Sequence, residues 1–143
     1  MRKVLKLFKK YLGKNKLMSV CTQGEKEPWC AIVFFAFDDN FNFIFASKKD
    51  TIHAKNIIKN KNVSLSIYQD WGRPWKLKGA QIKGVAKVLR EESKEYSKFY
   101  NIFKKRYKWI EKFPDHKIFI VKPKEIWWTN HVLFKTIERQ RIL

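Results

Sequence analysis

The sequence predicts a mainly β fold, a small antiparallel β-barrel with peripheral helices packed on its ends. Five or six segments carry the alternating or continuous apolar pattern of strands, and most of them follow one another through short, hairpin-like connections. Only one short and one longer helical segment interrupt these strands. That is too few for the strand–helix alternation of a parallel sheet, so an antiparallel barrel is the expected architecture.

The composition is that of one domain with a substantial core. The chain has 143 residues, of which 45% are hydrophobic and 16% aromatic, so intrinsic disorder is excluded. No apolar run approaches the roughly 20 residues of a membrane-spanning helix. We therefore expect residues 1–143 to form a single domain.

Residues 1–13 are predicted to form an amphipathic helix. Apolar residues recur at helical spacing from Val4 to Leu12, and Gly13 follows where a helix commonly ends. Lysines interrupt the segment, so it lacks the apolar region of a secretory signal. We expect the helix to lie on its own domain rather than on a membrane, and the protein to stay in the cytoplasm.

The first two strands are predicted to form a hairpin. Residues 17–22 and 29–37 are β-branched and aromatic runs, joined by a polar loop at residues 23–28. The second run has no polar side chain apart from the thiol of Cys30. We expect this run to be a central strand covered on both faces. Because one small barrel can bury only one of these faces, we also predict a homodimer.

A strand, a helix and a fourth strand follow. A turn at residues 38–40 leads into a third strand, antiparallel to the second, in which Phe41, Phe43 and Phe45 alternate with other residues. Asp50 or Thr51 is expected to cap the helix. The apolar positions predicted to be buried are Ala54, Ile57 and Ile58 in the helix and Val63, Leu65 and Ile67 in the fourth strand.

The second half of the chain contains a long strand and the longest helix. Within residues 76–89 the apolar phase changes between Leu77 and Ala80, which predicts a β-bulge at Gly79. A strand of that length is expected to bend and to serve two sheets. The remaining predicted segments are a helix at residues 91–106, strands at 117–121 and 125–129, and a tail at 129–143 without a clear pattern.

The two cysteines are expected to be free. Cys21 and Cys30 lie nine positions apart inside strand-like runs, not in a C-x-x-C pair. A metal site needs more ligands at closer spacing, so no metal is predicted. We expect two buried thiols rather than a disulfide.

Two stretches resemble the pyridoxamine 5′-phosphate oxidase-like split β-barrels. Residues 43–57, FIFASKKDTIHAKNI, and 60–65, NKNVSL, are similar to that superfamily's aromatic strand, Ser/Thr-rich turn, basic helix start and entry to the next strand. Residues 79–84, GAQIKG, with Val88 and Leu89 behind them, are similar to its V-x-x-G-x-x-x-x-L strand. The order of elements agrees, and the match is best to a small bacterial branch. The resemblance implies an FMN-binding split β-barrel.

The resemblance also implies where FMN binds, at a homodimer interface with its phosphate near the helix after the third strand. A helix N-terminus offers free N–H groups and a positive dipole to a phosphate. We expect the phosphate at Ser47, Lys48, Thr51 and His53, although these residues also fit a capped helix with solvated lysines and a surface histidine. Further cofactor contacts are expected from Gln81 and from the backbone amides of Ala31, Ile32, Val33 and Phe34.

The chain departs from the true oxidase in three places. Thr51-Ile52-His53-Ala54 stands where the oxidase has Ser-Arg-Lys-Ala, so an arginine fork on the phosphate is missing. The second strand lacks the basic residues that flank the flavin, and the C-terminal Arg/His pattern for the vitamin phosphate is missing too. We therefore expect an FMN-dependent oxidoreductase with a small-molecule redox substrate other than pyridoxamine phosphate. A weakly held FMN, another flavin-like group or a tetrapyrrole all remain open as its cofactor.

The strongly basic charge supports an alternative, a nucleic-acid-binding barrel without enzymatic activity. The chain has 32 Lys and Arg against 13 Asp and Glu, a net charge of +19, and aromatic side chains that could stack on bases. The lysines are spread over many elements, so we expect only nonspecific contact with nucleic acid.

No motif of a hydrolase, kinase or metalloenzyme is present. The aromatic residues that could instead cover a flat ring, or pack in the core, are Tyr68, Trp71, Trp75, Trp127 and Trp128.

Overall fold

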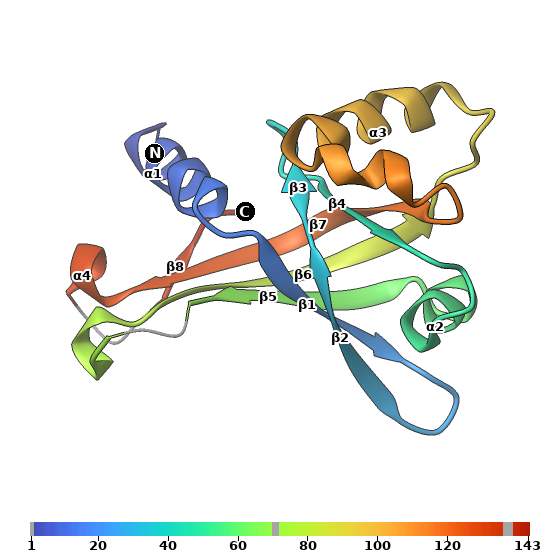
Figure 1. Ribbon diagram of the computed structural model, residues 1–143. Coiled ribbons are helices and arrows are strands. Elements are labelled where there is room, and N and C mark those ends of the chain that lie inside the picture. Colours follow the sequence, from blue (N-terminus) through green and yellow to red (C-terminus); the bar gives the residue numbers. More distant parts are fainter. Residues whose placement is uncertain (1, 70–71, 136–138) are drawn as a thin grey trace.

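The computed structural model describes residues 2–69, 72–135 and 139–143 (Figure 1). Helices α1 and α4 lie at one end of a long curled sheet and α2 lies at the other, while α3 packs on one side. In chain order the elements are α1 (Arg2–Gly13), β1 (Leu17–Gln23), β2 (Pro28–Phe34), β3 (Ala36–Phe37), β4 (Phe43–Ser47), α2 (Ile52–Lys59), β5 (Asn62–Tyr68), η1 (Pro74–Lys76), β6 (Lys78–Val88), α3 (Lys94–Arg106), η2 (Lys108–Lys112), β7 (Lys117–Asn130), α4 (His131–Phe134) and β8 (Gln140–Arg141).

The strands of the described residues form one antiparallel sheet with its two edges close together. The strand order is β2-β1-β5-β6-β7-β4-β3, and β8 pairs with β7. The two edge strands, β2 and β3, are separated in the chain only by Phe35. A flat sheet would hold these edges about 29 Å apart, so the sheet must curl until they meet at this residue. The predicted antiparallel split barrel with peripheral helices is confirmed.

The run at residues 29–37 is not the covered central strand that its composition predicts. It divides at Phe35 into β2 and β3, which lie at the two edges of the sheet. The carbonyl of Phe35 accepts hydrogen bonds from the side chains of Arg106 (2.9 Å) and Tyr107 (2.6 Å), so the region of α3 holds this carbonyl. The N–H group of Phe35 donates to the carbonyl of Lys16 (2.9 Å). As an edge strand, β2 is covered on its inner face only, and Ile32 on the outer face is 73% exposed.

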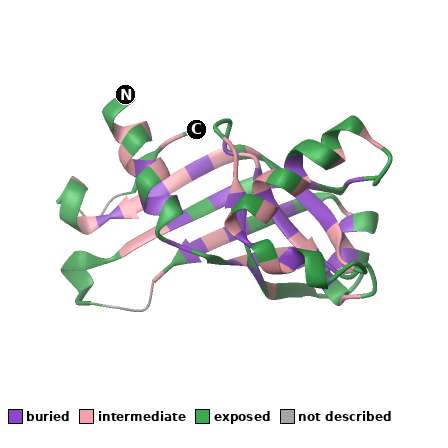
Figure 2. Cartoon of the chain, turned by 45° about the horizontal axis from the view of Figure 1, so that its top comes forward, coloured by how far each residue is buried: buried purple, intermediate pink, exposed green. Residues whose placement is uncertain are grey.

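The core fills the inside of the curl and extends under α3. Buried positions alternate with exposed ones along the strands (Figure 2). Helices α1 and α2 pack on the inner core, and α3 covers a second cluster over β4 and β7. The buried side chains that the helices contribute include Phe8, Tyr11 and Leu12 of α1, Ala54 and Ile57 of α2, and Phe99 and Phe103 of α3.

The third strand begins two residues later than predicted. A side-chain oxygen of Asp38 accepts hydrogen bonds from the backbone N–H groups of Asn40 (3.0 Å) and Asn42 (2.8 Å), which closes a tight turn. Phe41 lies in this turn with a φ of 59°, a left-handed conformation that a strand does not allow. Strand β4 therefore starts at Phe43 and pairs with β3 and β7.

Helix α2 starts as predicted, with one difference on its buried face. Thr51 is the N-cap, and its Oγ1 accepts a hydrogen bond from the backbone N–H of Ala54 (3.2 Å). Ala54 and Ile57 are buried, but Ile58 is 65% exposed. The buried stripe of this short helix is centred on positions 53, 54 and 57, so His53 takes the place expected for Ile58.

The irregularity between β6 and β7 lies further along β6 than the predicted bulge at Gly79. The register shifts between Lys83 and Gly84, where Lys124 of β7 is the extra residue. Even-numbered positions of β6 from Ala80 to Ala86 face the core without a change of phase. Leu77, which suggested the change, lies before the strand and is exposed.

The bulge also explains why β7 is one strand and not the two predicted at residues 117–121 and 125–129. Pro123 lies at the bulge, where a missing backbone N–H is tolerated, and pairing with β6 continues on both sides of it. Helix α3 begins at Lys94, three residues later than predicted, because Ser93 is its N-cap. Within the described part of the tail, α4 and β8 are short elements beside β7.

Gly84 is required where β6 crosses β7. A Cβ at this position would lie 2.6 Å from Val121 Cγ1 and 2.8 Å from the carbonyl oxygen of Lys122. Replacing Gly84 with alanine is expected to lower the free energy of unfolding by about 1–3 kcal/mol in denaturant titrations. Gly13→Ala is the control, because a Cβ there meets nothing within 4 Å. Equal effects of the two substitutions would contradict this packing role.

Both cysteines are free, as expected, but they are not both buried. Cys21 is half-buried and Cys30 is exposed, because β2 lies at the edge of the sheet.

The helices of the described residues include none that is long and apolar enough to cross a membrane.

Candidate functional site

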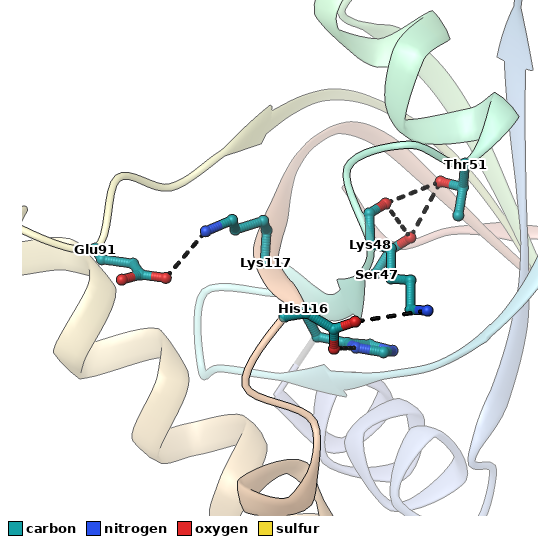
Figure 3. A network of polar contacts seen from close by, with 7 residues as sticks. Ser47, Lys48, Thr51, Glu91, His116 and Lys117 are labelled. Carbon is teal, nitrogen blue, oxygen red and sulfur yellow. Dashed lines mark hydrogen bonds and ion pairs between the residues drawn. The ribbon is translucent and has the colours of Figure 1, made fainter.

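The N-terminus of α2 carries a small network of hydroxyl groups and one imidazole. The Oγ atom of Ser47, at the end of β4, lies 3.2 Å from Thr51 Oγ1 (Figure 3). The same Ser47 atom lies 2.8 Å from His53 Nε2. Thr51 Oγ1 lies 3.3 Å from the same His53 nitrogen. The turn between β4 and α2 folds back on itself and brings these groups together. The structure thus joins three of the four residues predicted to hold a phosphate.

His53 is buried, so the alternative of a surface histidine is wrong. Its side chain is packed beside the ring of Phe45, and the residue is 8% exposed. Burial lowers the pKa of His53, so the imidazole is neutral at pH 7. A neutral imidazole has one nitrogen that accepts a hydrogen bond, which lets it pair with a hydroxyl of Ser47 or Thr51. In this state His53 positions the turn.

Ion pairs border this corner of the molecule. Lys48 Nζ lies 3.5 Å from a carboxylate oxygen of Asp115, and His116 Nδ1 lies 3.0 Å from the other oxygen (Figure 3). Lys117 is the register partner of Ser47 and lies 3.1 Å from Glu91. The hydrogen bond from His116 and the charge of Lys48 lower the pKa of Asp115. Lys48 and Lys117 therefore each have a carboxylate partner already, and an anion that binds either lysine has to displace that carboxylate.

The corner nevertheless fits a phosphate group. The N–H groups of Ile52 and His53 belong to the first turn of α2, where no helical carbonyl can reach them. The helix dipole adds positive potential at the same place. Lys49 is exposed and makes no ion pair with any residue that the structure describes. Free donors and an available cation are what a dianionic phosphate requires.

On β2 the four predicted residues divide into two pairs. The hydrogen bonds from Gly24 N–H to Glu27 (2.9 Å) and from Phe35 N–H to Lys16 (2.9 Å) fix the ladder between β1 and β2. Hydrogen-bonded pairs alternate with non-hydrogen-bonded pairs between these two bonds. Ala31 and Val33 fall in hydrogen-bonded pairs, so their backbone N–H and C=O groups point toward β1. Ile32 and Phe34 point theirs to the open edge, and their side chains face outward. Ile32 and Phe34 are therefore the two whose amides a ligand or a partner chain can reach.

Gln81 lies on the same outer face of the sheet as Ile32. Successive register pairs join one residue from each of six neighbouring strands in a single row. The row, which we call the outer row, is Ile32, Ser19, Ser66, Gln81, Trp127 and Arg141. The small side chains of Ser19 and Ser66 lie between the larger side chains of Ile32 and Trp127, so the surface is shallow at this part of the row. Such a surface can take a flat ring.

The tail of the chain supplies positive charge at the Trp127 end of the outer row. Arg139 donates a hydrogen bond from Nη1 to Gln81 Oε1 (3.0 Å), and its guanidinium lies 4.7 Å from the centre of the Trp127 ring. The Arg141 guanidinium lies 5.6 Å from the same ring. Sequence reasoning missed both arginines because the pairing of β8 with β7 is a contact distant in sequence. The alternating Arg-Gln-Arg triplet was the only local signal of a short strand.

The aromatic residues considered for a cleft are divided between surface and core. Tyr68 and Trp75 are exposed, whereas Trp128 is buried beneath α1 against Phe8 and Tyr11. Trp127 alone among these described residues lies in the outer row. Trp71 lies outside the described residues.

The two groups of predicted cofactor residues lie far apart in one chain. Ser47 pairs with Lys117 near the start of β7, whereas Gln81 pairs with Trp127 ten residues further along it. Ten residues of β-strand span about 33 Å, which is longer than a flavin mononucleotide. Within one chain, the α2 corner and Gln81 therefore lie beside opposite ends of β7.

The class of protein is that of the split β-barrels: an antiparallel sheet curls until its two edges meet at Phe35, and α2 carries lysines before its N-terminus. The family model described as pyridoxamine 5′-phosphate oxidase matches residues 4–130. The chain belongs to this family, as the resemblance in residues 43–65 and 79–89 suggested.

Known proteins similar to this chain bind more than one kind of cofactor. A UPF0306 protein of Campylobacter jejuni is 34% identical over 91 residues, which are 63% of this chain and 64% of that protein. The heme storage protein HutZ of Vibrio cholerae has the same fold, with a TM-score of 0.74 at 15% identity over 85% of this chain and 91% of that one. An FAD-binding protein of Mesorhizobium loti has a TM-score of 0.68 at 14% identity, over 82% and 88% of the two chains.

Proposed function

We propose that this protein is an FMN-binding oxidoreductase that works as a homodimer in the cytoplasm. The observation that carries the proposal is the α2 corner, where free helix N–H groups, hydroxyl groups and lysines converge in a chain of the pyridoxamine 5′-phosphate oxidase family. The FAD-binding protein of the same fold supports a flavin as the class of cofactor. The free thiols of Cys21 and Cys30 are consistent with a reducing compartment.

In this proposal the residues of the α2 corner hold the phosphate. The N–H groups of Ile52 and His53 donate to phosphate oxygens, and Lys48 exchanges its exposed ion pair with Asp115 for the phosphate. Ser47 and Thr51 keep the turn in shape through their hydrogen bonds to each other and to His53. Because the arginine of the true oxidase is missing, we expect this protein to bind the phosphate group with lower affinity than the oxidase does.

The flavin ring would lie on the outer row. Trp127, with the Arg139 guanidinium lying over its ring, offers a flat surface, and the amide NH₂ of Gln81 can donate to ring nitrogen and oxygen atoms. The edge amides of Ile32 and Phe34 offer donors and acceptors. When bound, the flavin supplies the redox chemistry. The role of these side chains is to orient the ring and to exclude water. The substrate is a small redox-active molecule, and pyridoxamine phosphate is disfavoured by the departures from the oxidase.

The separation of the two groups of residues is the reason for proposing a dimer. Because about 33 Å of β7 lies between them in one chain, a second copy has to bring its outer row to the first copy's α2 corner. The exposed Ile32, Phe34 and Leu17 form an apolar patch at the β2 edge, which suits a symmetric contact between copies.

Lys48 provides the test of the phosphate assignment. Lys48→Ala is expected to weaken FMN binding about tenfold or more, since a charge-assisted hydrogen bond contributes roughly 1.5–3 kcal/mol. Riboflavin lacks the phosphate and should bind equally well to both proteins in the same fluorescence titration. Lys61→Ala, an exposed lysine after α2, is the matched control. Equal losses for FMN and riboflavin would place the phosphate elsewhere.

A tetrapyrrole is the second candidate cofactor, because the heme storage protein HutZ shares the fold. The absorbance of freshly purified protein separates the two. Flavin absorbance supports the proposal, and a Soret band without flavin replaces it with heme binding. A colourless protein whose nucleic-acid affinity falls steeply with salt would instead favour the basic nucleic-acid-binding barrel.

A further inference from the structure

We propose that Cys21 and Cys30 form a redox-active pair that closes reversibly to a disulfide within one chain. The two residues are register partners on β1 and β2, and their sulfur atoms lie 2.7 Å apart. This site does not depend on the proposed flavin. It lies on the outer face of the edge hairpin, two residues closer to the tip than the outer row.

The backbone geometry suits a disulfide at this pair. Hydrogen-bonded pairs alternate along the hairpin from Gly24 with Glu27 to Lys16 with Phe35. Cys21 and Cys30 fall between them, in a non-hydrogen-bonded pair, where opposing Cα atoms are about 4.5 Å apart. Disulfides span Cα distances from about 4.4 to 6.8 Å. The bond can therefore form without separating the strands.

The two thiols have different roles in the reaction. Cys30 is exposed and reaches an oxidant first. Burial and the neighbouring Cys30 raise the pKa of Cys21 to about 11, although a hydrogen bond with Ser64 opposes this shift. Cys21 is thus mostly protonated at neutral pH and acts second. A groove lined by Cys21, Ser64 and Lys83 borders the pair on the Cys21 side, and Lys83 adds positive charge there.

The oxidant required is a small disulfide such as oxidised glutathione. The Cys30 thiolate attacks one of its sulfur atoms, which forms a mixed disulfide and releases one thiolate. The Cys21 thiolate then attacks the Cys30 sulfur, which forms the intramolecular bond and releases the second thiolate. The two protein thiols lose two protons and two electrons, and the small disulfide is reduced to two thiols.

The test is an equilibrium titration of the intact protein in glutathione redox buffers, with acid quenching, alkylation in denaturant and intact-mass measurement. The closed form is two hydrogen atoms lighter than the dithiol and takes up no label. Because the folded hairpin holds the thiols together, we expect the equilibrium constant for closure to be at least about tenfold larger in the folded chain than in the unfolded chain. Because a bond that forms more readily in the folded chain stabilises the folded chain, oxidation should raise the midpoint temperature of thermal unfolding.

Three controls make the result decisive. Cys21→Ser and Cys30→Ser should give only mixed disulfides with glutathione. The Ile32→Asp variant repeats the titration on a chain whose β2 edge cannot be covered by a partner. Closure no more favourable in the folded than in the unfolded chain, or a disulfide between chains as the main product, would overturn the proposal.

Discussion

Replacing Ile32 with aspartate is expected to convert the proposed homodimer to a monomer and to abolish the proposed flavin binding. Ile32 is 73% exposed on the outer face of an edge strand, at one end of the outer row. A carboxylate buried against an apolar partner surface costs several kcal/mol, which raises the dimer dissociation constant by about a hundredfold or more. Flavin binding should fall with it, because each proposed site uses groups from two chains. Light scattering and flavin fluorescence measure the two effects.

Ile58→Asp is the matched control for this prediction. Ile58 is 65% exposed on α2, so the substitution adds the same charge at a similarly exposed isoleucine away from the outer row. This variant should remain a dimer and keep its flavin. A wild-type mass of one chain at micromolar concentration, or an Ile32→Asp protein that binds flavin like the wild type, would contradict the proposed dimer.

The second large effect is expected at Arg106, which fastens the corner of the barrel. Its guanidinium donates to the carbonyls of Phe35 (2.9 Å), Gly13 (3.1 Å) and Asn15. These bonds join α3 to the end of α1 and to Phe35, the residue between the edge strands β2 and β3. Arg106→Met keeps the apolar stem but removes all three, and is expected to lower the free energy of unfolding by about 3 kcal/mol.

Lys105→Met on the same helix removes an exposed charge and should change stability by less than about 0.5 kcal/mol. Denaturant unfolding of both variants, followed by circular dichroism, compares them. An Arg106→Met protein as stable as Lys105→Met would show that the barrel corner does not depend on the guanidinium.

Features that depend on neighbours in the sequence could be predicted. The cap at Thr51, the alternation of Val63, Leu65 and Ile67, and the helix that became α3 were found because local periodicity and capping chemistry determine them. The place of each strand in the sheet could not be predicted. A continuous apolar run at residues 29–37 looks the same whether it is one central strand or two edge strands joined at a corner.

The same distinction applies to the candidate site. Ser47, Thr51 and His53 lie within seven residues, so their grouping was predictable, although the burial of His53 was not. The outer row depends on register between strands distant in sequence. Gln81 was suggested by resemblance alone, and its hydrogen bond to Arg139 had no local signature.

The central claim is that one flavin site is built from two chains, and mixing two defective variants tests it most directly. Lys48→Glu damages the α2 corner, and Trp127→Ala damages the outer row. Each variant alone should hold little flavin. Unfolded together in equal amounts and refolded with FMN, they should regain about one quarter of the wild-type flavin content, because half of the dimers are mixed and each mixed dimer has one intact site. A mixture that binds no more flavin than the average of the two variants would contradict the shared site.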